Sequence, residues 1–317
     1  MAAEVYPEDQ YPFLSLQMNS FLQRIRNPKF EPDQAPAPLL YQKPEALCKP
    51  IFKDLPNSFW QDQIQFSREW RESIARALER QNLSISKLDK HDTPRVISFL
   101  HRRYPAELAK EICAFDLYRF KQFGHGVVLE NKDKEVVGNV FEVAYDTSDR
   151  TSYTIRLAVD ERLKGQNLGY HIMVYSSLLA MERGSRVKRG LIQFDNHQSL
   201  HINLNKVGWI CSGFDPEIVG LGSFFEIALP LNIDGLATNA VDLTQVPSYL
   251  QSHRKGTDYQ LIASHDMDAV VNLYEKTDFK IAAFVMPGLL AHNQSYFLAL
   301  SPEQLSLQDY VSLREHA

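Results

Sequence analysis

The stretch from residue 157 to residue 170 has the residue types and spacing best suited to ligand chemistry. An apolar run, Leu157 to Val159, predicts a strand, and the turn after it contains Lys164, Gly165 and Asn167 before a helix begins. The first turn of a helix exposes backbone N–H groups and the positive end of its dipole, which favours a phosphate or pyrophosphate. Glycine and asparagine tolerate the left-handed backbone of such turns. A strand, a turn and a helix also follow one another for structural reasons alone. These residues by themselves therefore fit either a phosphate-binding turn or a purely structural one.

Other common chemical signatures are missing from the sequence. A P-loop needs glycine, four residues and then Gly-Lys-Ser or Gly-Lys-Thr, and a dinucleotide fingerprint needs GxGxxG, but neither motif is present. The three cysteines, Cys48, Cys113 and Cys211, are scattered and form no CxxC pair. We therefore expect no metal site, and cysteines that are small buried residues without a catalytic role.

The sequence around this turn predicts a mixed sheet covered by helices, an α/β arrangement. Period-two apolar patterns predict the strands, and apolar residues at helical spacing predict the helices. The expected elements are strands at 83–88, 126–130, 135–145, 152–159, 187–194, 209–211 and 224–229, and helices at 57–80, 93–102, 106–115, 168–183 and 197–206.

Two of these segments carry a family resemblance. The stretch Leu157 to Gly169 resembles the acyl-CoA binding motif of the Gcn5-related N-acetyltransferases (GNAT), in which a strand ending Leu-x-Val precedes an Arg-Gly-x-Gly-x-Gly turn and a helix. Asn196 followed by residues 204–209 is similar to the second family motif, an asparagine that opens a helix ending in a Tyr-x-Lys-x-Gly-Phe-like turn. The resemblance covers residues 83–231 and implies a GNAT-like mixed central sheet flanked by helices.

The resemblance also implies a cofactor, acetyl-CoA or another acyl-CoA, and direct acyl transfer to an amine. Backbone groups of the strand would pair with the pantetheine arm, turn amides would hold the pyrophosphate, and the helix-opening asparagine would contact the pantetheine. The implied cofactor-binding residues are Leu157, Val159, Lys164, Gly165, Gln166, Asn167, Leu168, Gly169 and Asn196.

Three positions depart from the family pattern. Lys164 replaces an arginine or glutamine, and Asn167 replaces a glycine. Leu204 stands where the family has a tyrosine that often serves as general acid, and an alkyl group cannot donate a proton. One extra residue separates Asn196 from this position, so Asn203, His201 or a rotated neighbour is an alternative donor.

The family commonly uses a carboxylate on a central strand, or a water held by one, as the base. The strand 152–159 has no acidic residue, so Glu142 on the preceding strand and Asp195 at a strand end are the candidates. Tyr274 is a further catalytic candidate, not as the base but as the family's tyrosine, because Leu273 to Phe279 is similar to the second family motif and here includes that tyrosine. An amphipathic core helix explains the same residues, and both interpretations stay open.

The chain divides into three parts. Residues 1–82, rich in proline and without glycine, predict an arm with a short helix at 13–26 and then a long amphipathic helix; residues 83–231 form the acyl-CoA binding domain. Residues 232–317 predict an α+β extension with strands at 259–263, 279–285 and 295–300 and a helix at 266–276. A degenerate half repeat of the GNAT domain is one interpretation of this extension, which would complete the sheet, supply Tyr274, or form an acceptor wall or a homodimer contact.

The composition limits the partners. The 34 Lys and Arg against 39 Asp and Glu give a net charge of −5, so nucleic acid is a poor partner. The longest apolar run, residues 281–291, is well short of the roughly 20 residues that span a bilayer. We expect a cytoplasmic protein that acts on a small-molecule or protein amine. A non-catalytic acyl-CoA binding module and an acyltransferase that uses a carrier protein are the alternatives.

Overall fold

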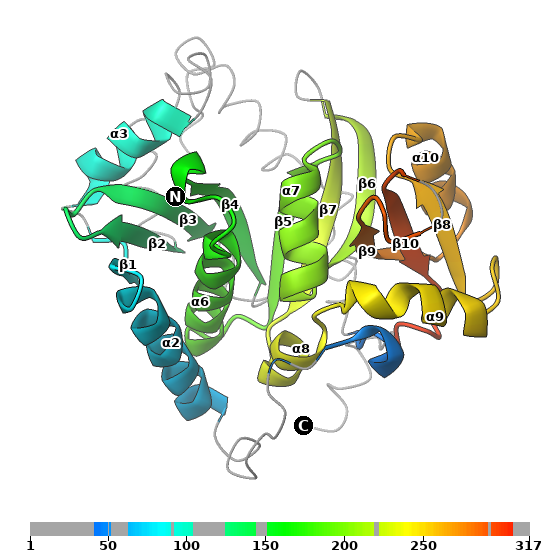
Figure 1. The fold of residues 1–317 in the computed structure, drawn as a ribbon, viewed down its shortest axis with the longest axis horizontal. Coiled ribbons are helices and arrows are strands. Elements are labelled where there is room, and N and C mark those ends of the chain that lie inside the picture. The colour runs from blue at the N-terminus through cyan, green and yellow to red at the C-terminus, as the bar shows by residue number, and fades with distance from the viewer. Residues whose placement is uncertain are drawn as a thin grey trace, which may run out of the picture.

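A computed structural model describes residues 41–49, 51, 63–89, 92–103, 124–143, 151–218, 222–290 and 293–306. The predicted helices at 13–26 and 106–115, and the start of the one at 57–80, lie outside these ranges. Within them, ten strands form one sheet in the order β1-β2-β3-β4-β5-β7-β6-β9-β10-β8, with helices against it (Figure 1). The predicted α/β fold class is confirmed.

Neighbouring strands of the sheet are antiparallel except for β4 and β5, which are parallel. A parallel pair needs a crossover, and α6 supplies it. The strands are β1 Leu83–Lys87, β2 Gly124–Asn131, β3 Val136–Val143, β4 Thr151–Val159, β5 Val187–Gln193, β6 Ile210–Ile218, β7 Gly222–Pro230, β8 Tyr259–Ala263, β9 Lys280–Val285 and β10 Tyr296–Leu300.

The longer helices occur where the sequence predicts them. The α-helices are α2 Gln63–Glu79, α3 Thr93–Arg103, α6 Leu168–Glu182, α7 His197–Leu200, α8 Ile233–Thr238, α9 Val246–Ser252 and α10 Met267–Lys276. The segment α7 continues as a π-helix, η6 His201–Val207, and short 3-10 turns occur at Glu45–Leu47, Glu161–Leu163 and Leu243–Gln245. Helices α8 and α9 were not predicted from the sequence, because six or seven residues are too short for a helical period to show.

Helix α6 packs against β2, β3 and β4 and lies beside α2, so most of its residues are buried (Figure 1). Its outer contact is α2, whose buried residues Trp70, Ile74 and Leu78 follow the helical spacing of the predicted stripe. A forked ion pair joins the two helices, because Arg71 Nε and Nη2 bond the two carboxylate oxygens of Glu182 at 2.8 and 2.9 Å. This packing fixes α6 over β2, β3 and β4.

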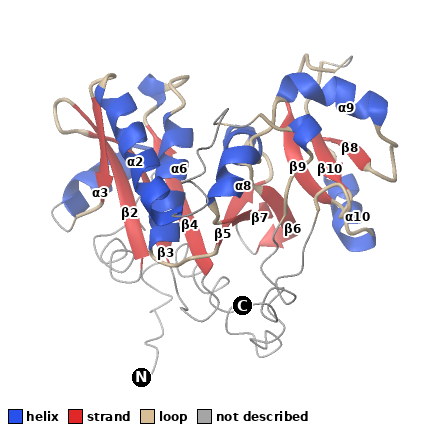
Figure 2. Cartoon of the chain, turned by 90° about the horizontal axis from the view of Figure 1, so that it is seen from below, coloured by secondary structure: helices blue, strands red, loops and turns tan. Residues whose placement is uncertain are grey.

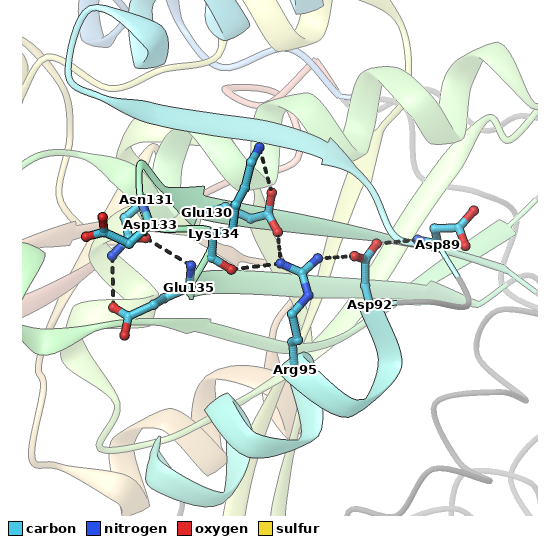
Figure 3. A network of polar contacts seen from close by, with 8 residues as sticks. All are labelled: Asp89, Asp92, Arg95, Glu130, Asn131, Asp133, Lys134 and Glu135. Carbon is cyan, nitrogen blue, oxygen red and sulfur yellow. Dashed lines mark hydrogen bonds and ion pairs between the residues drawn. The ribbon is translucent and has the colours of Figure 1, made fainter.

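Helix α3 covers the other face, with Val128, Val136 and Phe141, and Figure 2 shows it across the strands from α2 and α6. Arg95 attaches it to the turn between β2 and β3: its guanidinium bonds Asp92, Glu130 and the carbonyl oxygen of Lys134 (Figure 3).

The same network shapes the turn itself, where Asn131 Oδ1 accepts the backbone N–H groups of Asp133 and Glu135 at 3.0 and 2.9 Å (Figure 3). These contacts hold the outer part of the sheet and have no evident chemical role. No helix among the described residues is long and apolar enough to cross a membrane.

The sheet continues past residue 231, the expected end of the domain, into the C-terminal strands. Strand β6 pairs with β9 at Cys211 and Ile281, and β9 then pairs with β10. A second cluster of buried apolar residues, which includes Tyr249, Leu298 and Leu300, lies under α9. The extension is thus joined to the first part by one continuous sheet.

Candidate cofactor site

The parallel strands β4 and β5 separate at the centre of the sheet. Their pairing starts at Thr151 and Val187 and ends at Thr154 and Gly190, so residues 155–159 of β4 lie beyond it. An extended ligand can pair with an exposed strand edge of this kind through main-chain hydrogen bonds. Leu157 and Val159, predicted from the sequence to bind the pantetheine, lie on this part of β4 and are half-buried.

A bulge lies at the opening. Ile155 faces Phe141 of β3 but Ala158 faces Asn139, so β4 contains one residue more than β3 over this stretch. Arg156 takes a left-handed backbone, with φ of 57°, and its carbonyl oxygen accepts a 3.3 Å bond from Asn139 Nδ2. A bulge redirects backbone groups and bends its strand, and bulges are common beside active sites.

The predicted phosphate turn leads from the opening into α6. Asn167 is the N-cap of α6 with φ of 58°, and its side chain makes no capping bond to the helix. The first amides of a helix have no acceptor within the helix, and the first turn of α6 has no acidic residue. Residues 164–167 are exposed, whereas Leu168 and Gly169 are buried. The turn therefore offers backbone N–H groups to an anion.

The packing around Gly169 is tight. A Cβ atom there would lie 3.0 Å from the Cδ1 atom of Ile202, which belongs to the π-helix. The π-helix thus packs directly on the first turn of α6.

Lys206 was not singled out from the sequence, although it stands at the lysine of the second motif. Its ammonium group bonds Asn167 Oδ1, so it lies at the phosphate turn. Burial lowers the pKa of Lys206. Burial, followed by the charge of Lys206, also lowers the pKa values of His171 and His201. The side chain of Asn167, which replaces a glycine of the family pattern, is therefore held by a cation at the turn.

Glu142 lies beside the start of the opening. Its Oε1 atom accepts hydrogen bonds from Thr154 Oγ1 at 3.0 Å and from Ser176 Oγ at 2.7 Å, and it pairs with the ammonium group of Lys188. The side chains of Glu142 and Lys188 are 1% and 0% exposed. Burial lowers the pKa of Lys188. Thr154, whose hydroxyl donates to this carboxylate, is the last β4 residue that pairs with β5.

His125 belongs to the same buried polar group and was also missed, because no motif marks it. It faces Glu142 across β2 and β3, and its Nε2 atom lies 3.2 Å from the carbonyl oxygen of Ser176. Burial lowers the pKa of His125 to about 4. Polar side chains thus extend beneath α6 from His125 through Glu142 to Lys188.

The other predicted catalytic residues are not brought to Glu142. Asp195 is exposed in the turn after β5, and Asn196 caps α7 by accepting the Ser199 N–H at 3.0 Å. The Tyr274 hydroxyl donates to the carbonyl oxygen of Cys211 on β6, beyond β5 and β7 from the opening, at 2.9 Å. Burial raises the pKa of Tyr274 well above its usual value.

The residue that replaces the family tyrosine, Leu204, is fully buried in the core. Of the alternatives considered, Asn203 bonds the carbonyl oxygen of Ser199 at 2.9 Å, and His201 is half-buried near Lys206. The extra residue in this segment coincides with the π-helix, a form in which each turn holds more residues than an α-helix and which is frequent at functional sites.

Three solved structures to which about half of this chain is similar are acetyltransferases. A ribosomal-protein-S18-alanine N-acetyltransferase from Escherichia coli is 15% identical, with 48% of this chain and 95% of that chain covered and a TM-score of 0.40. A GNAT-family acetyltransferase from Streptococcus pneumoniae is 14% identical, with 46% and 97% covered and a TM-score of 0.39. A spermidine N-acetyltransferase chimera from Vibrio cholerae and hSSAT is 10% identical, with 47% and 96% covered and a TM-score of 0.41.

No protein-family model and no curated protein matches the sequence. The structural similarity covers about half of the chain at low identity. The function therefore has to be inferred from the site itself.

Proposed function

We propose that this protein is an N-acyltransferase that moves an acyl group, in the simplest case acetyl, from acyl-CoA directly to an amine. The observation that carries the proposal is the opening between β4 and β5, which leads straight into the amides at the start of α6. Acyl-CoA has an extended pantetheine arm that ends at a pyrophosphate, so it needs an exposed strand edge next to a group of N–H donors. The lysines Lys164 and Lys206 add positive charge at the anionic end.

Together, the residues at the opening are suited to hold acyl-CoA. The edge of β4 at Leu157 and Val159 would hold the pantetheine, and the amides of residues 166–169 would hold the pyrophosphate with Lys206 beside them. The Oδ1 atom of Asn196 caps α7. The side-chain nitrogen Nδ2 of Asn196 can therefore donate to a pantetheine carbonyl. Bound acyl-CoA supplies a thioester carbonyl that an amine can attack.

For the proton, Glu142 is the best placed of the predicted catalytic residues. Thr154 Oγ1 donates to Glu142 Oε1 and can at the same time accept a proton from an amine in the opening. We assign Glu142 as the base acting through Thr154, and Lys188 as its buried partner. The positions of Asp195, in an exposed turn, and Tyr274, at β6, favour neither for this role.

A non-catalytic acyl-CoA binding module is the second candidate. Two observations favour it: Leu204 places an alkyl group in the core where the family has a proton donor, and Glu142 is held in an ion pair with Lys188. Both candidates bind acyl-CoA, and only the first consumes it.

Binding and turnover of acetyl-CoA separate the candidates. We expect acetyl-CoA at 100 times its dissociation constant to stabilise the protein by about 2.7 kcal/mol in thermal unfolding. We also expect release of free CoA thiol with a cationic amine, because the net charge is −5. A polyamine is the first acceptor to test, since one matched structure is a spermidine N-acetyltransferase.

The variant Thr154→Val keeps the shape of the side chain and removes the hydroxyl. We expect it to bind acetyl-CoA as the native protein does and to release thiol about 100-fold more slowly, the scale of a lost proton-transfer path. Binding without turnover by the native protein, with all amines tested, would favour the binding module. Absence of binding would exclude both candidates.

A further inference from the structure

The strand pairing of residues 187–229 recurs in residues 259–300. Ile192 of β5 faces Phe225 of β7, and about 70 residues later in the chain Ile262 of β8 faces Phe297 of β10. The hydrogen bond that follows is also repeated: Phe194 N–H donates to the carbonyl oxygen of Ser223 at 2.9 Å, and Ser264 N–H to that of Ser295 at 3.0 Å.

The helices and bulges between these strands match as well. Asn196 caps α7 and Asp266 caps α10, each by accepting the N–H three residues later at 3.0 Å. Strand β6 has one extra residue at Ser212 in its pairing with β7, and β9 has one at the equivalent Ala282 in its pairing with β10. Two bulges at the same place are poorly explained by chance.

The sheet order shows how the two units are joined. It reads β5-β7-β6 and then β9-β10-β8, so the equivalent strands β6 and β9 meet in the middle, and they are antiparallel. Two copies related by a two-fold axis between β6 and β9 would give this order. Among the described residues, nothing equivalent to β4 and α6 lies beyond β8, so the second unit has neither an opening nor a phosphate turn.

A side chain, Asn205, continues the junction where the strand pairing ends. Asn205 Oδ1 accepts the N–H of Phe284 at 2.9 Å, and Asn205 Nδ2 donates to the carbonyl oxygen of Phe284 at 2.7 Å. The π-helix is thus attached to β9 as a neighbouring strand would be. These two bonds also fix which end of the amide is the donor, because Phe284 presents both a donor and an acceptor.

The second hydrogen of the Asn205 amide nitrogen determines the state of His201. Asn205 Nδ2 lies 2.9 Å from His201 Nδ1. Since this nitrogen only donates, Nδ1 must be the acceptor, and the ring proton is on Nε2. A protonated His201 would point an N–H at another N–H. Burial and the charge of Lys206 also lower the pKa of His201.

A buried cation strengthens the same junction. Lys43 Nζ donates to the carbonyl oxygens of Leu204 in the π-helix and Ala282 in β9, both at 2.7 Å. The backbone of Leu204, the residue before Asn205, is therefore linked to β9 through Lys43.

We propose that residues 259–300 are a second copy of the unit 187–229, which completes the first unit instead of building a site of its own. In this scheme β9 holds Asn205, and Asn205 fixes His201 as the neutral tautomer with its proton on Nε2. His201 shares the π-helix with Lys206, which lies at the phosphate turn. Asn205 is a positioning residue in this scheme. His201 presents a fixed N–H donor on the π-helix that also carries Lys206, whose ammonium group bonds Asn167 at the turn before α6; that an anion bound there belongs to acyl-CoA rests on the proposed function.

Nitrogen NMR of the full chain labelled at histidine tests the tautomer directly. His201 is assigned by its loss in His201→Gln. We expect Nδ1 to resonate as an unprotonated ring nitrogen at pH 7 and Nε2 as a protonated one. In Asn205→Asp the carboxylate can only accept, so we expect the proton to move to Nδ1 or the ring to become charged. A native His201 with its proton on Nδ1 would overturn the proposal even if Asn205→Asp does not fold.

Two controls separate this role from general stability. Tyr274→Phe removes another hydrogen bond of the same β6 and β9 junction, and Glu275→Gln changes the exposed residue equivalent to Asn205 in the second unit. We expect the His201 signals to be unchanged in both. A shift in Tyr274→Phe as large as in Asn205→Asp would assign the effect to the junction in general and overturn the role of Asn205.

Affinity for CoA provides the second readout. We expect Asn205→Asp to weaken CoA binding about tenfold, equivalent to about 1.4 kcal/mol, and Tyr274→Phe to leave it within about twofold. Equal affinities for Asn205→Asp and the native protein would overturn the link to the anion site. If the native protein does not bind CoA but His201 has the expected tautomer, the proposed function fails and the role of Asn205 in fixing His201 stands.

Discussion

The two matching units, residues 187–229 and 259–300, share strands, bulges and helix caps but differ in their surroundings. The first adjoins β4 and α6, whereas the second ends the described sheet at β8. The tyrosine of the second family motif is present in the unit without an opening, as Tyr274, where its hydroxyl bonds Cys211; the equivalent residue in the first unit is the buried Leu204. The same motif position thus differs between the units: a tyrosine occurs where no opening lies beside it, and a leucine occurs beside the opening. The residue type at a motif position is therefore not enough to assign it a catalytic role.

The largest difference between the units is expected at Lys188 and its equivalent, Asp258. Lys188→Met leaves the carboxylate of Glu142 buried without its cation, and we expect the free energy of unfolding in urea to fall by about 3–5 kcal/mol. Asp258 is half-buried and accepts the backbone N–H of Arg254 at 2.7 Å, so we expect Asp258→Asn to cost about 1 kcal/mol or less.

The double variant Glu142→Leu with Lys188→Met provides the control. Because it removes both charges, we expect it to regain most of the lost stability. If the double variant is no more stable than Lys188→Met alone, the loss comes from packing and not from an unpaired charge.

The second prediction concerns Lys43, which contacts both units. Burial lowers its pKa from 10.5 to about 7 in the folded protein. Between these pH values the unfolded chain binds more protons than the folded one, so the free energy of unfolding rises with pH in this window. We expect Lys43→Met to reduce this rise by up to about 1.4 kcal/mol per pH unit, the limit for one proton.

The measurement is a set of urea titrations from pH 7 to pH 10 on both proteins. Other lysines with lowered pKa values, such as Lys188 and Lys280, contribute equally to both curves and cancel in the difference. Identical slopes would show that Lys43 is not buried between the units.

Much of the fold was predictable from the sequence, because the long elements follow regular periods. Strand β8 was predicted with its observed bounds, and α6 to within one residue. The conformation of the turn before α6 was predictable, since glycine and asparagine at Gly165 and Asn167 mark a left-handed backbone, which both adopt. The conformation of a turn is a local property that the residue types reveal.

The contacts between distant segments could not be predicted. The bond from Lys206 to Asn167, the ion pair of Glu142 with Lys188, and the placement of Asn205 against β9 depend on how helices pack on the sheet. The π-helix was also missed, since a single extra residue in a helical period resembles a shifted end of the helix. The proposed repeat is visible in the sequence only at Leu273 to Phe279, because strand pairing matches between the two units where residue types do not.

The third prediction compares two lysines at equivalent positions. Lys206 bonds Asn167 Oδ1 at the phosphate turn, and Lys276 bonds Asn272 Oδ1 on α10. We expect Lys206→Met to weaken CoA binding about tenfold, as the loss of a charge-assisted contact does, and Lys276→Met to leave it unchanged. Calorimetric titration with CoA measures both. Equal effects of the two variants would mean that only the net charge matters.

The smallest expected effect, and the sharpest comparison, concerns the two helix caps. Asn196→Ala and Asp266→Ala each remove one side-chain bond to a helix amide, so we expect each to lower the free energy of unfolding by about 1 kcal/mol. If Asn196 also contacts the pantetheine, Asn196→Ala weakens CoA binding and Asp266→Ala does not, although both variants lose the same stability. Urea titration and calorimetry on the same two variants measure both quantities. A loss of CoA affinity shared by both caps would place the effect in the fold, whereas a loss confined to Asn196→Ala would place the ligand at the first unit alone.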